Sequence, residues 1–160
     1  MMHTRAAELL QTLGMRPHPE GGHYVEVFRS ARRVDVLDRN VVRSAITTIY
    51  FLLAGGEFSR WHRVVSDEIW HYHEGDAIEL LLFDERGFRR TRLGPVARET
   101  RPTVVVPAGT WQAARSTGAY TLGGCTVGPG FDFADFALAV DWPDIAAKIA
   151  SAGPDLARFI

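Results

Sequence analysis

The chain has 160 residues, enough for one domain with a single hydrophobic core. Hydrophobic residues make up 46% of it and charged residues 23%, a composition that excludes a disordered tail. The 18 Lys and Arg against 19 Asp and Glu leave a formal net charge of −1, and no basic block stands out. A nucleic-acid partner is therefore not expected.

A single cysteine, Cys125, excludes an intramolecular disulfide framework, a four-cysteine zinc site and an iron–sulfur cluster. One thiol is more typical of a reducing cytoplasm than of a secreted domain. The first residues lack the apolar stretch of a signal peptide. The longest strongly apolar run, residues 44–56, is too short for a helix that spans about 30 Å of hydrocarbon. We expect a soluble cytoplasmic protein without a membrane partner.

Helical patterns stand at the two ends of the chain. The segment 4–13 predicts an amphipathic helix, with Thr4 as its N-cap and Gly14 as its end. A second helical segment is expected over about 141–160, where Pro143 stands in the first turn.

Between the ends, the pattern is that of extended chain. The strand-like runs are rich in β-branched and aromatic residues and cover residues 23–28, 44–53, 67–73, 77–83, 103–106 and 120–127. Short strands without intervening helices indicate an all-β sandwich or barrel, which we place at about 20–140 in a single domain of residues 1–160. Both faces of 44–53 are apolar, so a helix, a second sheet or a subunit interface is expected over its outer face.

Histidines offer two alternative sites. His71 and His73 are two apart on one predicted strand, so their side chains share a face. With Glu79 from the next strand, this pair could hold a metal ion. The simpler interpretation is two imidazoles on the outer surface of the sheet.

The second alternative joins His62 and Glu68 across a predicted hairpin, with Gln112 as a third polar group after a turn. Four aromatic residues would wall this cluster: Trp61, Trp70, Tyr72 and Trp111. An imidazole, a carboxylate and an amide among aromatic rings are typical of a small-molecule pocket. The competing interpretation is a buried hydrogen-bond network without a ligand.

The spacing around these residues resembles the two cupin motifs, G-x5-H-x-H-x3,4-E-x6-G and G-x5-P-x-G-x2-H-x3-N. The first matches as His62-x-Val64-x3-Glu68-x6-Gly75, and the second as Pro107-x-Gly109-x2-Gln112-x3-Ser116. The whole chain resembles the fifth cupin family, whose phrases recur as Pro17-His18-Pro19-Glu20-Gly21-Gly22, Trp61-His62-Arg63-Val64, Asp67-Glu68-Ile69-Trp70-His71, Val105-Val106-Pro107-Ala108-Gly109, Trp111-Gln112-Ala113 and Pro129-Gly130-Phe131-Asp132-Phe133.

This resemblance implies a double-stranded β-helix, or jelly-roll barrel, that pairs as a homodimer. The metal site of such cupins uses three histidines and one glutamate. Here Val64 stands at one histidine position and Gln112 at another, which leaves His62 and Glu68 as good ligands. No resident cofactor is expected, although a divalent metal could bind weakly at His62, Glu68 and Gln112.

The resemblance also suggests metal-free chemistry, because cupin epimerases of nucleotide sugars use a histidine base and a tyrosine acid. On that scheme His62, oriented by Glu68, abstracts a proton, and Tyr72 or Tyr50 returns one. Trp70 and Gln112 shape the pocket, Glu20 reaches it from a Gly-Gly turn, and an anionic group of the ligand meets Arg63, Arg60 or Arg43.

The expected function is thus a small-molecule-binding cupin, with isomerisation or epimerisation of a polar or anionic, sugar-nucleotide-like ligand as its reaction. Two alternatives stay open: a non-catalytic binding or sensor protein, and a weakly metal-dependent oxygenase or isomerase. The fold hosts many reactions, so the sequence does not choose among them.

Overall fold

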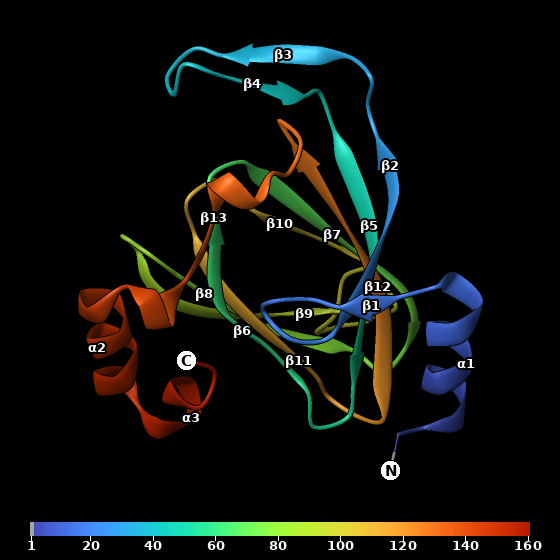
Figure 1. Cartoon of the computed structure of the whole chain (residues 1–160). Coiled ribbons are helices and arrows are strands. Elements are labelled where there is room, and N and C mark those ends of the chain that lie inside the picture. Colours follow the sequence, from blue (N-terminus) through green and yellow to red (C-terminus); the bar gives the residue numbers. More distant parts are fainter. Residues whose placement is uncertain (1) are drawn as a thin grey trace.

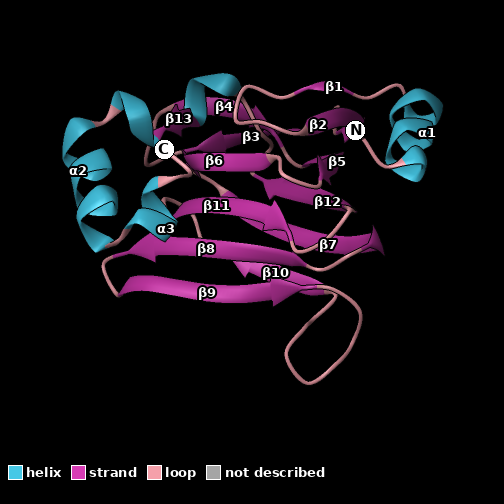
Figure 2. Ribbon diagram, turned by 90° about the horizontal axis from the view of Figure 1, so that it is seen from below, coloured by secondary structure: helices cyan, strands magenta, loops and turns pink. Residues whose placement is uncertain are grey.

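Two large antiparallel sheets, a separate two-stranded hairpin and three α-helices make up the computed structural model, which describes residues 2–160 (Figures 1 and 2). The helices are α1 (Thr4–Leu13), α2 (Pro143–Ala152) and α3 (Pro154–Ala157). The strands are β1 (Arg16–Pro17), β2 (His23–Arg29), β3 (Arg33–Val36), β4 (Val41–Ser44), β5 (Thr47–Ala54), β6 (Phe58–Val64), β7 (Asp67–Gly75), β8 (Ile78–Asp84), β9 (Gly87–Leu93), β10 (Thr103–Val106), β11 (Trp111–Ser116), β12 (Tyr120–Gly128) and β13 (Phe136–Leu138).

The sheets face each other and enclose a hollow. The first has the order β1-β2-β5-β12-β7-β10 and the second the order β13-β6-β11-β8-β9. From β5 to β8 consecutive strands alternate between the two sheets, so each turn crosses from one layer to the other. This topology confirms the predicted all-β jelly-roll barrel. Strands β3 and β4 form a separate hairpin that projects beyond the barrel (Figure 1).

Helices cover part of each sheet from outside, on opposite sides of the barrel (Figure 1). Helix α1 packs Ala6 and Leu9 on Leu52, Ala54 and Leu122 of the first sheet. Helices α2 and α3 pack on the second sheet in a cluster made of Trp61, Leu81, Trp111, Ala113, Ala139, Ile149, Leu156 and Phe159. Strand β5, which lies in the run 44–53 with two apolar faces, is thus covered on its outer face by a helix at one end, as predicted.

Some predicted boundaries were wrong. The N-cap of α1 is His3, whose side chain accepts a hydrogen bond from the amide of Arg5, rather than Thr4. Gly14 ends the helix as predicted, with φ 63°. The single strand predicted over 44–53 is interrupted between β4 and β5. The chain leaves the hairpin there, and the amide of Ala45 bonds to the carbonyl of Arg32 instead of a sheet neighbour.

The helices of residues 2–160 are all either too short or too polar to cross a lipid bilayer.

Candidate functional site

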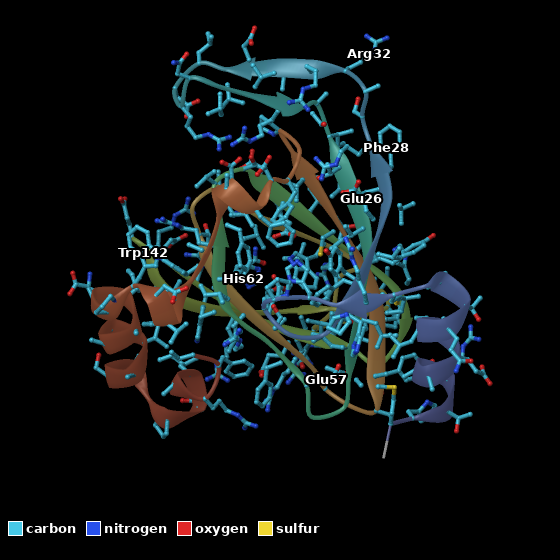
Figure 3. The ribbon with its side chains drawn as sticks, viewed as in Figure 1. Glu26, Phe28, Arg32, Glu57, His62 and Trp142 are labelled. Atoms are coloured by element: carbon cyan, nitrogen blue, oxygen red, sulfur yellow. The ribbon has the colours of Figure 1, made fainter. Side chains whose placement is uncertain are left out.

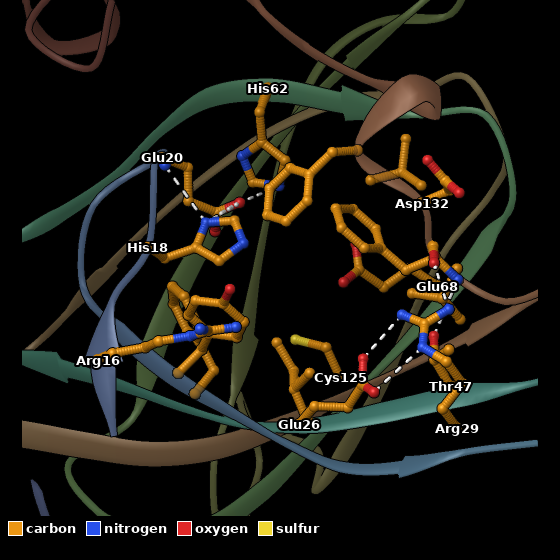
Figure 4. A pocket seen from close by; sticks show the side chains of 17 residues that line it. Arg16, His18, Glu20, Glu26, Arg29, Thr47, His62, Glu68, Cys125 and Asp132 are labelled. Atoms are coloured by element: carbon orange, nitrogen blue, oxygen red, sulfur yellow. Dashed lines mark hydrogen bonds and ion pairs between the residues drawn. The ribbon is translucent and has the colours of Figure 1, made fainter. Parts of the chain in front are cut away.

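A cavity of about 320 Å³ lies between the two sheets and opens to solvent at one end of the barrel (Figure 4). Aromatic and aliphatic side chains form its walls, chiefly Tyr24, Ile49, Phe51, Val64, Val127, Phe131 and Phe133. The polar groups that reach it are Arg16, His18, Glu20, Glu26, Arg29, Thr47, His62, Glu68 and Asp132, together with the thiol of Cys125. An apolar cavity with a few convergent polar groups is typical of a small-molecule site, and its volume lies near the lower end of the usual range of about 300–1,000 Å³.

A short strap, residues 18–22, carries two of these polar groups into the cavity. The strap bonds to itself, from the amide of His18 to the carbonyl of Gly22 (3.0 Å), and to β6, from the amide of Arg60 to the carbonyl of Glu20 (2.8 Å). Gly21 has φ 111°, and a Cβ atom there would overlap the carbonyl oxygen of Phe58. Only glycine therefore lets the strap lie this close to β6, which directs Glu20 inward.

The carboxyl group of Glu20 lies between two imidazoles. Its Oε2 atom is 3.3 Å from Nε2 of His62 and 3.3 Å from Nδ1 of His18 (Figure 4). Its Oε1 atom accepts a hydrogen bond of 2.7 Å from the hydroxyl of Ser59. Both His62 and Glu20 are buried.

The hydrogen bonds of the two rings fix where their protons lie. Nδ1 of His62 is 2.7 Å from the carbonyl oxygen of Arg60, which only accepts, so this nitrogen carries the hydrogen and Nε2 presents a lone pair to Glu20. Nδ1 of His18 accepts from the amide of Glu20 at 3.3 Å, so it also presents a lone pair. A carboxylate between two lone pairs would be repelled. One proton therefore has to be held on Glu20 or His62.

Burial shifts the pKa of the carboxyl group and the pKa values of the two imidazoles in opposite directions. It raises the pKa of Glu20 from 4.5 to about 8, although the hydrogen bond from Ser59 opposes the shift. Burial lowers the pKa of His62, and it lowers that of His18 to about 3, with the charge of His62 adding to the second effect. The neutral pair, protonated Glu20 with uncharged His62, is the form that these shifts favour.

Glu68 also lines the cavity, and Gln112, which does not, is bonded to it. The indole Nε1 of Trp70 donates to Oε1 of Gln112 at 2.9 Å, and Nε2 of Gln112 donates to Oε2 of Glu68 at 2.5 Å. Burial raises the pKa of Glu68 as well. The amide of Gln112 is thus used within the protein, and it holds Glu68 in place rather than lining the cavity.

Sequence reasoning brought His62, Glu68, Gln112 and Trp70 together as a cluster, and the structure places these four in contact or close proximity. The carboxyl group that contacts His62 is that of Glu20, however, and not that of Glu68. The sequence predicts only a ligand-binding role for Glu20, because nothing in the spacing reveals that the strap lies across β6.

Other residues assigned to ligand binding or catalysis do not line the cavity. The hydroxyl of Tyr72 donates to the carbonyl of Gly75 at 2.7 Å, and Tyr50 packs beside α1 and His73. Arg63 lies on the outside of β6 between the rings of Trp111 and Trp142, 5.0 and 4.7 Å from their centres. Arg60 and Arg43 are bonded elsewhere, to the carbonyl of Pro19 and to Asp135.

Residues that the sequence did not single out line the cavity instead. Tyr24, Arg16 and His18 all reach the cavity, and the guanidinium of Arg16 lies 5.0 Å above the ring of Tyr24. Arg29 is held at the mouth by Glu26 through two bonds of 3.1 and 2.7 Å. The alternation of β2 places Tyr24 and Glu26 on one face, and a register shift between Glu26 and Phe28 adds Arg29 to it. Arg16 and His18 precede β2, so its alternation does not place them.

The alternative metal site is not assembled. His71 and His73 lie on the outer face of the first sheet, where His71 contacts Thr126. Glu79 belongs to the second sheet and is bonded to Arg115 at 2.8 Å. More generally, residues 2–160 contain no group of three or more His, Cys, Asp or Glu side chains arranged to hold a metal ion.

Residues 7–139 match the family described as Cupin superfamily (DUF985). The chain belongs to the cupin superfamily. Two solved structures share about a third of its residues: a hypothetical protein from Leishmania major (34% identity, 87% of this chain and 93% of that chain, TM-score 0.75) and a protein from Shewanella oneidensis (33%, 86% and 85%, TM-score 0.76).

More distant cupins share the fold alone. They include a cupin 2 domain-containing protein from Halorhodospira halophila (20% identity, 91% of this chain and 86% of that chain, TM-score 0.58). Another is a variant of oxalate decarboxylase from B. subtilis, with 16% identity and a TM-score of 0.59. The match covers 84% of this chain and 34% of the decarboxylase chain. A comparison with curated proteins found no match.

The cupin metal site does not fit the residues of this chain. Val64 offers no donor atom at one ligand position, and the amide of Gln112 at another is engaged by Trp70 and Glu68. A site of three histidines and one glutamate would need two imidazoles that these positions lack. The donor set of this cupin is therefore suited to holding protons rather than a tightly bound metal.

The buried carboxyl should make stability depend on pH. Because the pKa of Glu20 is raised to about 8, its contribution to stability is largest below its ordinary pKa of 4.5 and is lost as the pH rises toward 8. The lowered histidine pKa values act only below 6.5. Between pH 6.5 and 8 we expect the free energy of unfolding to fall by roughly 2 kcal/mol.

Urea denaturation of the Glu20→Gln variant at these two pH values tests this expectation. The variant should lose less than half as much stability as the unmodified protein, because it lacks the carboxyl with the raised pKa. Glu99→Gln, which alters a carboxyl on an exposed loop, is the matched control and should leave the dependence unchanged. An equal slope in all three proteins would contradict the assignment.

Proposed function

We propose that this cupin binds a small polar or anionic metabolite in its barrel and moves a proton on it without a metal, as an isomerase or epimerase does. The observation that carries the proposal is the carboxyl of Glu20 held between His62 and His18 on the floor of the cavity. The cytoplasm is the proposed compartment, and pairing of two chains is part of the proposal.

The chemistry follows from one mobile proton. When Glu20 transfers its proton to Nε2 of His62, its carboxylate can accept a proton from a carbon atom of the ligand while protonated His62 donates a hydrogen bond to it. Glu20, now in its acid form again, donates a proton back to the ligand, and His62 then returns its own proton to Glu20. A pKa of about 8 keeps both forms of Glu20 accessible near neutral pH, which is the condition for general acid–base catalysis.

The walls and mouth of the cavity suggest what the ligand carries. Aromatic rings on both sides suit a flat or ring-shaped body, and the guanidinium of Arg16 is a cation without a hydrogen-bond partner among residues 2–160. A carboxylate or phosphate of the ligand would supply that partner. A sugar nucleotide would place its sugar inside and extend outward, because the cavity is small.

Binding and proton exchange test the proposal separately. The probes are a panel of carboxylated and phosphorylated sugars, sugar nucleotides and their neutral analogues, followed by thermal shift and by NMR detection of deuterium taken up from ²H₂O. Arg16→Gln should weaken binding of the anionic members about tenfold and spare the neutral ones. Arg32→Gln, an exposed arginine far from the cavity in Figure 3, is the control.

Deuterium uptake by a ligand that binds would support catalysis. Binding without uptake would support the non-catalytic binding protein instead. If the panel binds equally to the unmodified protein and to Arg16→Gln, the role of Arg16 is wrong.

A further inference from the structure

An irregularity of β2 brings the ion pair of Glu26 and Arg29 to the cavity. Residues three apart on a regular strand point to opposite faces of the sheet. The register of β2 against β5 shifts between Glu26, opposite Ile49, and Phe28, opposite Thr48, so one extra residue is inserted between them. Glu26 and Arg29 therefore both line the cavity. Bulges of this kind redirect side chains next to functional sites, which indicates a role for this pair in the cavity.

Glu26 occupies the edge of Arg29 that would otherwise bind a ligand. Nε and Nη2 of Arg29 donate to the two carboxylate oxygens of Glu26 at 3.1 and 2.7 Å, a bidentate arrangement (Figure 4). A carboxylate or phosphate of a ligand would need the same pair of donors. Nη1 of Arg29 donates to the carbonyl of Phe131 at 3.0 Å. Arg29 is thus a cation of the cavity whose charge is neutralised within the protein.

A second carboxylate adds to this effect. Asp132 also lines the cavity, and its Oδ1 accepts a hydrogen bond of 2.9 Å from the amide of Ala134, whereas its Oδ2 has no hydrogen-bond partner among residues 2–160. The hydrogen bond to Glu26 raises the pKa of Arg29, and the charges of Glu26 and Asp132 act in the same direction. An anionic group that approached Arg29 would therefore meet two carboxylates, and such contacts between like charges disfavour binding.

Arg16 differs from Arg29. It lines the same cavity, but its side chain makes no hydrogen bond or ion pair within residues 2–160 and instead lies above the ring of Tyr24. Figure 4 shows Arg16 and Arg29 on different sides of the cavity. A ligand with anionic groups at both ends would thus find a free guanidinium at one end and a neutralised one at the other.

We propose that Glu26 determines the specificity of the cavity: by holding Arg29 it leaves Arg16 as the guanidinium that is free for a ligand, and it selects ligands with a single anionic group. This inference rests on the function proposed above and narrows its ligand to a sugar acid or hydroxy acid, whose carboxylate Arg16 can bind. A phosphate monoester carries a charge of about −1.5 to −2 near pH 7, and the diphosphate of a sugar nucleotide carries at least as much. Both would need the second cation, which Glu26 occupies.

The Glu26→Gln variant tests the proposal because it releases Arg29. The probes are inorganic phosphate and pairs of sugar acids with and without a phosphate on another carbon atom. By calorimetry, we expect the unmodified protein to bind each acid about tenfold more tightly than its phosphorylated form, and Glu26→Gln to lose this preference. Inorganic phosphate should shift the NMR signal of the Arg29 Nε–H at lower concentrations in Glu26→Gln. The double variant Glu26→Gln/Arg29→Gln should lose the gain in phosphate binding.

Glu8→Gln is the matched control. Glu8 pairs with Arg5 at the same sequence spacing, on α1 and away from the cavity, and both ion pairs are about half exposed. Neither substitution should unfold the protein, which thermal denaturation checks, and Glu8→Gln should bind every probe like the unmodified protein.

Two results would overturn the inference: an Arg29 signal that responds to phosphate equally in the unmodified protein and in Glu26→Gln, or an unmodified protein that prefers the phosphorylated acids. If no sugar acid, sugar phosphate or sugar nucleotide binds, the function proposed above is wrong. The titration with inorganic phosphate needs none of these ligands, so it still supports or overturns the hold of Glu26 on Arg29.

Discussion

Replacing His62 by glutamine is expected to reduce proton exchange into a bound ligand by about a hundredfold to ten-thousandfold, because general acid–base groups contribute this much. The ring lies 3.3 Å from Glu20 and is anchored by the carbonyl of Arg60. Glutamine can keep a hydrogen bond to Glu20 but cannot take up a proton. Binding of the ligand should change far less than exchange, since the walls of the cavity are intact.

The matched control is His23→Gln. His23 begins β2 but does not line the cavity, and its ring faces Glu57 instead. NMR would follow deuterium uptake at equal ligand occupancy, with a chemical denaturation curve to confirm folding. Unchanged exchange in His62→Gln would remove this residue from the mechanism, and equal losses in both variants would point to a general effect of histidine replacement.

The Gly21→Ala substitution is expected to destabilise the fold and to displace the strap. Alanine at φ 111° is strained, and its methyl group would overlap the carbonyl of Phe58, which is backbone and cannot turn aside. The combined cost should be about 3 kcal/mol or more in the free energy of unfolding. Because the strap carries Glu20 and His18, ligand binding should weaken together with stability.

Gly56 offers the control. It also has positive φ, 88°, but nothing lies within 4 Å of where its Cβ would be. Gly56→Ala therefore measures backbone strain alone, about 1 kcal/mol, and should leave the cavity unchanged. Urea denaturation and the ligand panel would be applied to both variants. Equal losses of stability would show that close packing of the strap against β6 is unimportant.

Periodicity predicted the first sheet apart from β1, because Val, Ile, Phe and Tyr dominate its strands, but of the second sheet it predicted only β8. It did not reveal β9, whose sequence GFRRTRL is rich in arginine. That strand lies at the edge of its sheet, and long cationic side chains can alternate outward there. It also missed β11, where Ala113 and Ala114 fill narrow spaces between the sheet and its neighbours.

The site was predictable only where spacing along the chain determines proximity in space. His62 and Glu68 lie on consecutive strands joined by a short turn. The two strands belong to facing sheets and do not form the predicted hairpin, yet the short turn brings both side chains to the cavity between the sheets. Glu20 is 42 positions from His62, and its contact depends on how the strap crosses β6. Tyr72 shares its inward parity with Glu68 and Trp70, yet it lies farther along the strand, packed against the core. Alternation along a strand determines which face of the sheet a side chain lies on, but not how far along the barrel it lies.

The strap has one more implication. Most of its attachment to β6 runs through its own main chain: the carbonyls of Glu20 and Pro19 receive bonds from Arg60, and Gly21 rests against the carbonyl of Phe58. The carboxyl of Glu20 adds one hydrogen bond to this attachment, from the hydroxyl of Ser59. A single codon change at position 20 would therefore install a different functional group while most of the bonds that hold the segment stay in place.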